Sequence, residues 1–342
     1  MKKILFFLLV VSVFVANSQS LAELYKEVNS SVVVIDIISV APEKTGDQIE
    51  LVAQASQGSG VLISEDGLIW TASHVVQSAE EVQIEFLDGD IYEGEVLTSN
   101  EEADVALVKI SQGFQLKNKK VAAIGDSDKA EIGEDVFVLG APHGFKQSLS
   151  RGILSGRFSP EGLMNDFVKI EFLQTDASIN PGNSGGPMFN MQGEVIGIAS
   201  RIYTNSGGFE GIGFVMSSNV AYKLLMEEAS LWGGMESMLV SGAIAAALNV
   251  PQESGLLVMN VSSKGAGGQL GIQGGYIPAT IDGVDLVIGG DIILEMAGIL
   301  VKDVNSLFEV RKKIANLPAG QDISMTILRN GKVGQGTFKK LQ

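Results

Sequence analysis

The feature that most constrains the fold of this chain is a series of short β-branched runs between Ser31 and Met216, separated by Gly, Asn and Asp. The runs are Val32–Ile38, Gly60–Ile63, Val82–Phe86, Val105–Ile110, Val136–Leu139, Val168–Gln174 and Val195–Ile198. Short apolar runs at close spacing predict an all-β barrel or sandwich rather than alternating strands and helices. The polar segment Ser111–Lys120 divides this region into two similar stretches, as two successive barrels require.

The pattern changes after the last of these runs. Residues Ser218–Ser230 have helical spacing, and Gly233-Gly234 follows them. A strand at Gly255–Val261 and a helix from about Asp303 to Asn316 are expected next, and Asn330-Gly331 predicts a tight hairpin near the end of the chain. A length of 342 residues suggests about two domains. We therefore expect one domain at 21–230 and a second at 231–342.

The first twenty residues are expected to form a signal peptide. Lys2 and Lys3 precede an unbroken apolar run, Ile4–Val15, and a small, polar stretch follows. This run is short for a membrane span. An uncleaved anchor, which would keep the protein close to a membrane, and a short buried strand remain the alternatives. The chain has no cysteine, which in an exported protein favours a bacterial envelope or periplasmic location over a disulfide-rich extracellular scaffold.

Composition excludes several classes of function. The net charge is −16, and no cluster of Lys or Arg occurs beyond the extreme N-terminus, so nucleic acid is not an expected partner. The absence of cysteine excludes a Cys nucleophile, a lipoprotein attachment and a thiolate metal site. We expect neither a cofactor nor a metal ion.

The string with the most specific chemistry is Asn180–Pro187, with the sequence NPGNSGGP. A serine hydroxyl becomes an effective nucleophile when a base removes its proton and donors stabilise the oxyanion. Glycines around a serine let the backbone turn sharply and direct several N–H groups to one point. We therefore predict Ser184 as the nucleophile and the N–H groups of Gly182 and Ser184 as the oxyanion hole. A Gly-rich turn with a solvent-facing serine is the alternative.

The chain contains two histidines that could be the base. His74 follows an apolar strand in the sequence TASHVV, whereas His143 lies in an expected loop. A neutral imidazole can accept the serine proton and later return it to the leaving amine. We favour His74 because of the motifs near it.

A carboxylate must orient this imidazole and stabilise its charged form. Asp104 stands at the beginning of an apolar strand in ADVALVKI, where a carboxylate can be partly buried and directed. Other aspartates have turn-like surroundings and are interpreted as solvated turn residues: Asp88, Asp90, Asp126 and Asp128. We predict Asp104 as the third member of the triad.

The order of TASHVV, ADVALVKI and NPGNSGGP resembles the chymotrypsin-like fold and, more narrowly, the HtrA/Deg serine proteases. The resemblance implies a mainly β protein with two six-stranded β-barrels of the trypsin-like fold and the active site between them. It also implies a homotrimer and a C-terminal PDZ-like α+β domain that binds peptides. The stretch Leu231–Met235 would bind the peptide carboxylate, and residues Gln273–Asp285 are an insertion relative to the shortest PDZ pattern.

The resemblance predicts a serine endopeptidase of the cell envelope that acts on unfolded segments or C-terminal peptides of misfolded or regulatory proteins. Position 178 is Ser rather than the Asp of a trypsin-like pocket, and an apolar pocket of Ile179, Ile212 and Phe214 would favour cleavage after small aliphatic residues. These three could instead be ordinary core residues. Two alternative functions are a stress-sensing protease with a single target and a catalytically silent chaperone or peptide-binding protein.

Overall fold

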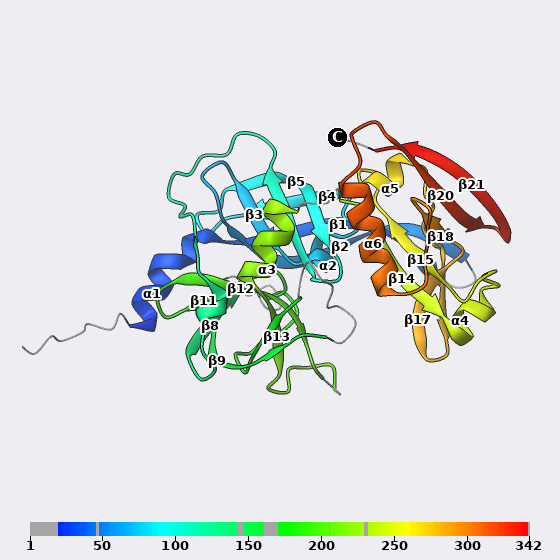
Figure 1. Ribbon diagram of the computed structural model, residues 1–342. Coiled ribbons are helices and arrows are strands. Elements are labelled where there is room, and N and C mark those ends of the chain that lie inside the picture. The colour runs from blue at the N-terminus through cyan, green and yellow to red at the C-terminus, as the bar shows by residue number, and fades with distance from the viewer. Residues whose placement is uncertain are drawn as a thin grey trace, which may run out of the picture.

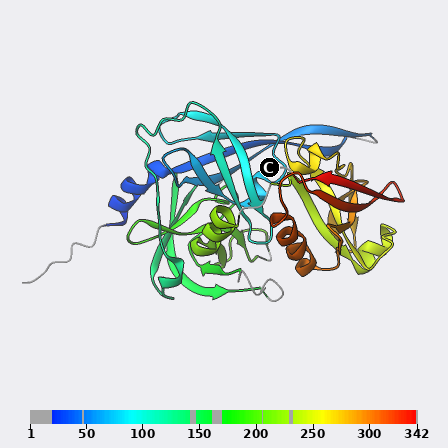
Figure 2. The same ribbon diagram turned by 45° about the horizontal axis from the view of Figure 1, so that its top comes forward.

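The computed structural model describes residues 20–45, 48–141, 147–160, 170–204, 206–228 and 232–340. It contains two adjacent β-barrels and a C-terminal α+β unit beside the first barrel (Figures 1 and 2). The expected signal peptide lies outside the described residues, apart from Ser20. Among the residues described, no helix is both long and apolar enough to cross a membrane.

The first barrel is closed by six antiparallel strands in the order β1-β2-β3-β6-β5-β4. Their bounds are β1 (Val32–Thr45), β2 (Gln48–Leu62), β3 (Leu68–Thr71), β4 (Glu81–Glu85), β5 (Ile91–Asn100) and β6 (Val105–Ile110). Alternate apolar residues such as Ile35, Ile69 and Val108 fill its interior. The short helix α2 (Ser73–Val76) lies between β3 and β4.

The second barrel is formed by six further strands and is closed by pairing between β11 and β12. The strands are β8 (Asp135–Gly140), β9 (Ser148–Phe158), β10 (Phe172–Thr175), β11 (Pro187–Asn190), β12 (Glu194–Ile202) and β13 (Gly213–Ser217), with β7 (Ala123–Ile124) added parallel to β12. The expected run Val168–Gln174 begins outside the described residues. The prediction of two six-stranded barrels is confirmed.

A shared apolar core joins the two barrels. Helix α1 (Leu21–Val28) is capped by Ser20 and buries Leu24 and Val28 in this core, which also contains Trp70 of the first barrel and Phe189 of the second. Four short helical elements complete the described part of this half: the 3₁₀ turns η1 (Asn29–Ser31) and η2 (Ser127–Lys129), the helix α3 (Ser218–Tyr222) and the π-helical turn η4 (Lys223–Glu227) after it. The expected helix at 218–230 is therefore present over the residues described.

The C-terminal unit is built on the sheet β14-β15-β18-β20-β21, with β19 paired to β18. Its elements are β14 (Met235–Ser241), α4 (Gly242–Ala247), β15 (Ser254–Val261), α5 (Ala266–Gln269), β16 (Ile277–Ile281), β17 (Val284–Ile288), β18 (Ile292–Met296), β19 (Ile299–Leu300), α6 (Val304–Ala315), β20 (Asp322–Arg329) and β21 (Lys332–Lys339). Asp303 caps α6 as expected, and its carboxylate accepts the Ser306 N–H at 2.8 Å. The predicted turn at Asn330-Gly331 is present, with positive φ at both residues.

The beginning of the C-terminal unit is attached firmly to the first barrel. Leu231 lies outside the described residues, but Trp232 is buried in the core of the first barrel, and its indole N–H donates to the Gln77 carbonyl at 3.2 Å. The insertion Gln273–Asp285 forms the greater part of the β16–β17 hairpin, and β16 contacts β1. The two parts of the chain therefore share an interface on the first barrel.

Candidate active site

His74 is presented by the short helix that follows β3. The neighbouring residues Ser73, Val75 and Val76 are buried and fix the helix to the barrel, whereas 51% of the His74 side chain is exposed. Strand β3 is itself buried between β2 and β6. The apolar strand and the helix together hold the imidazole at the surface of the first barrel.

The Asp104 carboxylate contacts the His74 imidazole at Nδ1. Its two carboxylate oxygens are each 2.9 Å from His74 Nδ1, and Oδ1 also accepts the His74 backbone N–H at 3.1 Å. Asp104 ends a turn that begins at Glu101, and it has a φ of 54°, a left-handed conformation that Asp tolerates better than most residues. Its side chain is only 10% exposed. This geometry places Nδ1–H against the carboxylate and leaves Nε2 to face a nucleophile.

The second barrel contributes a further donor to this carboxylate. Ser200, near the end of β12, donates its hydroxyl proton to Asp104 Oδ2 at 2.5 Å. Sequence reasoning did not identify Ser200, because a serine within an apolar strand carries no signal of its partner in another barrel. The contact joins the aspartate of the first barrel to the barrel that carries Ser184.

The electrostatics of the pair favour a charged Asp104 and a basic His74. Burial lowers the pKa of His74, but the hydrogen bond and the charge of Asp104 outweigh this effect, so the pKa lies above its ordinary value. Burial also acts to raise the pKa of Asp104, but the hydrogen bonds from His74 and Ser200 and the charge of His74 lower it below its ordinary value. The pair is therefore arranged as a carboxylate that stabilises an imidazolium.

The segment that carries Ser184 packs directly on the elements that carry His74. The Ser184 carbonyl accepts the Ser59 N–H at 2.8 Å, and Gly185 N–H donates to Ala199 at 2.7 Å. Gly185 has a φ of 82°, and a Cβ at this position would lie 2.2 Å from Thr71 Oγ1 and 2.8 Å from the Ala72 nitrogen. Only glycine allows this close approach, which brings Ser184 to the end of β3 immediately before His74.

The backbone around Ser184 leaves two N–H groups available. Asn183, Gly185 and Gly186 donate to carbonyl oxygens, whereas among the described residues no acceptor is present for the N–H of Gly182 or Ser184. Gly182 has a φ of 101°, and its carbonyl accepts the Ser59 hydroxyl at 2.7 Å. These are the two N–H groups that the sequence predicts for an oxyanion hole.

The three residues predicted for the substrate pocket do not gather in one cluster. Ile179 is buried in the second barrel, and its Cδ1 lies 2.8 Å from the position of a Cβ on Gly213. Phe214 follows Gly213 and therefore points to the other face of β13, where its ring lies 5.4 Å from that of Phe158. Ile212 is half-buried. Side chains alternate between the two faces of β13, so Ile179 and Phe214 lie on opposite faces of this strand. The role of the three residues in specificity stays a prediction.

The remaining titratable candidates have other partners or lie outside the described residues. Lys119 binds Asp88 at 2.8 Å and Asp90 at 2.6 Å, while Asp126 accepts the Asn219 amide at 2.7 Å. His143 lies outside the described residues. Within the part of the chain that the structure describes, no group of His, Asp and Glu is suited to a metal ion.

Comparison with known proteins agrees with this geometry. Residues 58–198 match the family described as trypsin-like peptidase domain. The chain is 34% identical over 306 residues to the "Probable periplasmic serine endoprotease DegP-like" of Halomonas elongata, covering 85% of this chain and 59% of the relative. It is 34% identical over 283 residues to the protein of the same name from Pseudomonas putida strain GB-1, covering 81% and 54%. The chain thus spans a little over half the length of these relatives.

Solved structures of similar length give the same result. The structure "HtrA-type protease AlgW with decapeptide" has a TM-score of 0.52 and 25% identity, and the match covers 94% of this chain and 98% of that one. The structure "HtrA-type protease AlgWS227A with tripeptide" has a TM-score of 0.53 and 26% identity, covering 95% and 98%. The predicted resemblance to HtrA-type proteases with a trypsin-like peptidase domain is confirmed.

Proposed function

We propose that this chain, which carries a trypsin-like peptidase domain and resembles HtrA-type proteases, is a serine endopeptidase of the periplasm. The observation that carries the proposal is the contact of the Asp104 carboxylate with His74 Nδ1 at 2.9 Å, beside a serine whose own N–H has no acceptor among the residues that the structure describes. A histidine held in this way can act as a base, and a free pair of N–H groups can stabilise an oxyanion.

The proposed reaction has two stages. In the first, Ser184 Oγ attacks the carbonyl carbon of the scissile bond while His74 Nε2 takes the hydroxyl proton, and the oxyanion is stabilised by the N–H groups of Gly182 and Ser184. Collapse of this intermediate breaks the peptide bond, and His74 returns the proton to the leaving amine. In the second, water activated by His74 hydrolyses the acyl-enzyme, while Asp104 keeps the imidazole oriented and stabilises its charged form.

We further propose that residues 231–342 are a PDZ-like domain that binds C-terminal peptides. The carbonyl groups of Gly233 and Gly234 accept the N–H groups of Gly267 and Ser262, whereas no acceptor for their own N–H groups occurs among the described residues. Free backbone N–H groups at the end of an apolar groove suit a terminal carboxylate. Cleavage after small aliphatic residues, misfolded or regulatory proteins as substrates, and a homotrimeric assembly remain predictions from the family resemblance.

The test is covalent labelling of Ser184. The wild-type protein should react with a fluorophosphonate probe and hydrolyse an unfolded protein substrate, whereas Ser184→Ala should do neither and should retain its folded circular dichroism spectrum. Ser324→Ala, at an exposed position on β20, is the matched control and should behave as the wild type. Hydrolysis by Ser184→Ala at a substantial fraction of the wild-type rate would contradict the assignment.

A further inference from the structure

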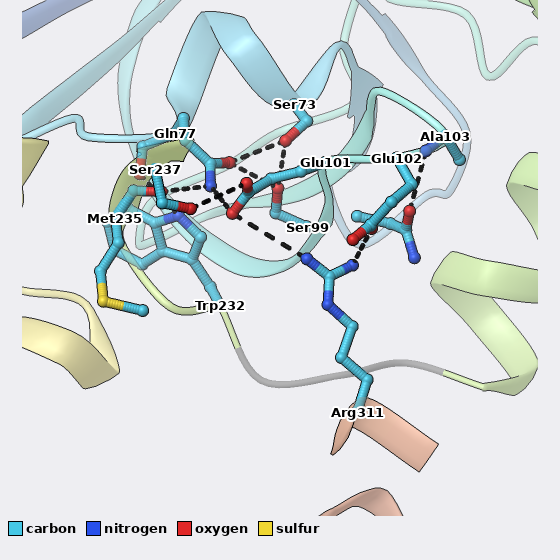
Figure 3. A network of polar contacts seen from close by, with 11 residues as sticks. Ser73, Gln77, Ser99, Glu101, Glu102, Ala103, Trp232, Met235, Ser237 and Arg311 are labelled. Carbon is cyan, nitrogen blue, oxygen red and sulfur yellow. Dashed lines mark hydrogen bonds and ion pairs between the residues drawn. The ribbon is translucent and has the colours of Figure 1, made fainter. Parts of the chain in front are cut away.

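The C-terminal unit contacts the first barrel at the two short segments that carry His74 and Asp104. One segment is the end of α2, where Gln77 follows the helix. The other is the turn from Glu101 to Asp104, in which the Asp104 N–H donates to the Glu101 carbonyl at 3.2 Å. Figure 3 shows these segments facing Trp232, Met235 and Arg311 of the C-terminal unit. The interface therefore lies next to the pair that orients the proposed base.

The Gln77 side chain binds to α2, to the turn that begins at Glu101 and to the C-terminal unit. Its Oε1 accepts the hydroxyl protons of Ser73 at 2.7 Å and of Ser99 at 3.1 Å. Its Nε2 donates to the Glu101 carboxylate and to the Met235 carbonyl. A primary amide has two donor hydrogens, and both have acceptors here; its oxygen accepts from the Ser73 and Ser99 hydroxyl pair, whose oxygens also lie 2.6 Å from each other. Gln77 is only 8% exposed, and water cannot readily replace these partners.

The partners of Gln77 stand immediately beside the catalytic pair. Ser73 precedes His74 in the helix, and its hydroxyl is 2.6 Å from that of Ser99. Glu101 begins the turn that ends at Asp104. A displacement of the Gln77 amide therefore acts on the backbone of both residues whose contact sets the orientation of the imidazole.

Side chains of the C-terminal unit bind the same turn. The Ser237 hydroxyl donates to Glu101 at 3.3 Å, and the Arg311 guanidinium pairs with Glu102 and lies 3.9 Å from Glu101. Burial raises the pKa of Glu101 to about 7, even though the charge of Arg311 acts to lower it. The Glu101 side chain is 35% exposed, and Gln77, Ser237 and Arg311 contact it, so the position of the turn is linked to that of the C-terminal unit.

A cavity of about 550 Å³ lies against this network. Its walls include Met235, Leu307 and Arg311 of the C-terminal unit together with Leu97 and Glu101 of the first barrel. It is bordered by β14 and α6, the elements between which the proposed peptide groove would lie. A ligand in this space would touch the turn that leads to Asp104 as well as the C-terminal unit.

We propose that Gln77 is a positioning residue, whose side-chain amide transmits the placement of the C-terminal unit on the first barrel to the His74–Asp104 pair. The inference rests on the proposed function, since it concerns the same active site. When Met235 is in place, each N–H of the Gln77 side-chain amide has an acceptor, and the Trp232 indole holds the backbone carbonyl of the same residue. When they move, the buried amide loses partners and must reorient, because an unsatisfied buried donor is unfavourable. Ser73 and Glu101 then move with it.

The test is Gln77→Met, which keeps the length of the side chain and removes its hydrogen bonds. We expect kcat to fall about 10- to 100-fold, as small misplacements of catalytic groups do, with KM changed less than about twofold. The acid limb of the pH profile should also move to lower pH, because a less well-placed Asp104 raises the pKa of His74 less. The matched control, Gln54→Met at an exposed position of β2, should leave kcat and the acid limb unchanged.

A second variant tests the link to the C-terminal unit. Trp232→Phe removes the indole N–H that donates to the Gln77 carbonyl and keeps an aromatic ring in the core. It should lower kcat and shift the acid limb in the same direction as Gln77→Met. The double variant should lose little more than Gln77→Met alone, since changes that act through one route are not additive.

The outcomes separate this inference from the proposed function. A wild-type protein that neither hydrolyses substrate nor reacts with a fluorophosphonate would overturn the proposed function itself. The inference would be overturned if the wild type is active but the acid limb of Gln77→Met is not shifted. Gln77 would then have a structural role alone, whether or not kcat falls. If Gln77→Met does not fold, Trp232→Phe decides: a normal acid limb and a normal kcat would refute the proposed transmission.

Discussion

The close approach between the Ser184 segment and strand β3 can be tested by placing a methyl group in the contact. Gly185 and Gly89 have nearly the same positive φ, 82° and 85°. A Cβ on Gly89 would meet nothing within 4 Å, whereas a Cβ on Gly185 would lie 2.2 Å from Thr71 Oγ1 and 2.3 Å from the Ser59 carbonyl oxygen. The pair of variants therefore separates the cost of the backbone conformation from the cost of the contact.

The expected magnitudes follow from these distances. Alanine in a left-handed conformation costs about 1–2 kcal/mol, and both Gly185→Ala and Gly89→Ala should lose this amount. Overpacking adds about 1–3 kcal/mol, and only Gly185→Ala should show this second loss because the atoms it meets belong to the backbone and to a buried threonine. Gly185→Ala should also slow the reaction of Ser184 with a fluorophosphonate, since relief of the contact must move the serine away from β3.

Urea unfolding of the two variants measures the difference in the free energy of unfolding, and probe labelling measures the effect on Ser184. Comparable m-values in all three proteins are needed for the comparison. If both variants lose the same stability, or if Gly185→Ala labels at the wild-type rate, the Ser184 segment does not pack on β3 as described. Gly89→Ala should label at the wild-type rate.

Two further predictions concern the charged pair. Asp104 raises the pKa of His74 above its ordinary value of 6.5, and the base must be neutral to act. The value of kcat/KM should therefore fall on acidification with an apparent pKa above 6.5, and Asp104→Asn should lower that apparent pKa. A wild-type apparent pKa below 6.5 would contradict this prediction. Ser200→Ala removes one of the hydrogen bonds that lower the pKa of Asp104, so it should reduce the free energy of unfolding, measured in urea near neutral pH, by about 1.5–3 kcal/mol. This loss should shrink as the pH falls through the pKa of Asp104. Ser324→Ala is the control, and equal losses in both variants would exclude a role for this bond.

The barrels could be predicted because their signal is local. Each short run of β-branched residues forms a strand wherever both faces are covered, and the turn residues between the runs limit the strand lengths. The prediction underestimated β1, which was expected to end near Ile38 and extends to Thr45. In the structure β1 and β2 pair continuously to Thr45 and Gln48, so the partner strand, rather than the apolar pattern, sets the length of this hairpin.

The meeting of His74 and Asp104 was predicted from motifs rather than from any physical property of either residue. An aspartate before an apolar strand indicates where a carboxylate can be partly buried, but it does not indicate what the carboxylate faces. Two serine hydroxyls near the site carry no such signal, because a serine contacts whatever the fold brings to it: Ser200 donates to Asp104, and Ser59 donates to the Gly182 carbonyl. Sequence reasoning therefore found the residues with rare chemistry and missed the hydroxyl groups that hold them.

The contacts between the first barrel and the C-terminal unit were even less predictable from the sequence. The sequence predicted that a second domain begins at Leu231, but no pattern indicated that Trp232, the next residue, would enter the core of the first barrel. Gln77 and Glu101 are polar residues that follow a helix and a strand, positions where solvent exposure is the usual expectation. In the structure Gln77 is buried and the Glu101 side chain is 35% exposed, and residues of the C-terminal unit contact both. The residues next to His74 and Asp104 thus owe part of their own environment to the C-terminal unit, and this is the basis on which we propose that its placement affects the geometry of the pair.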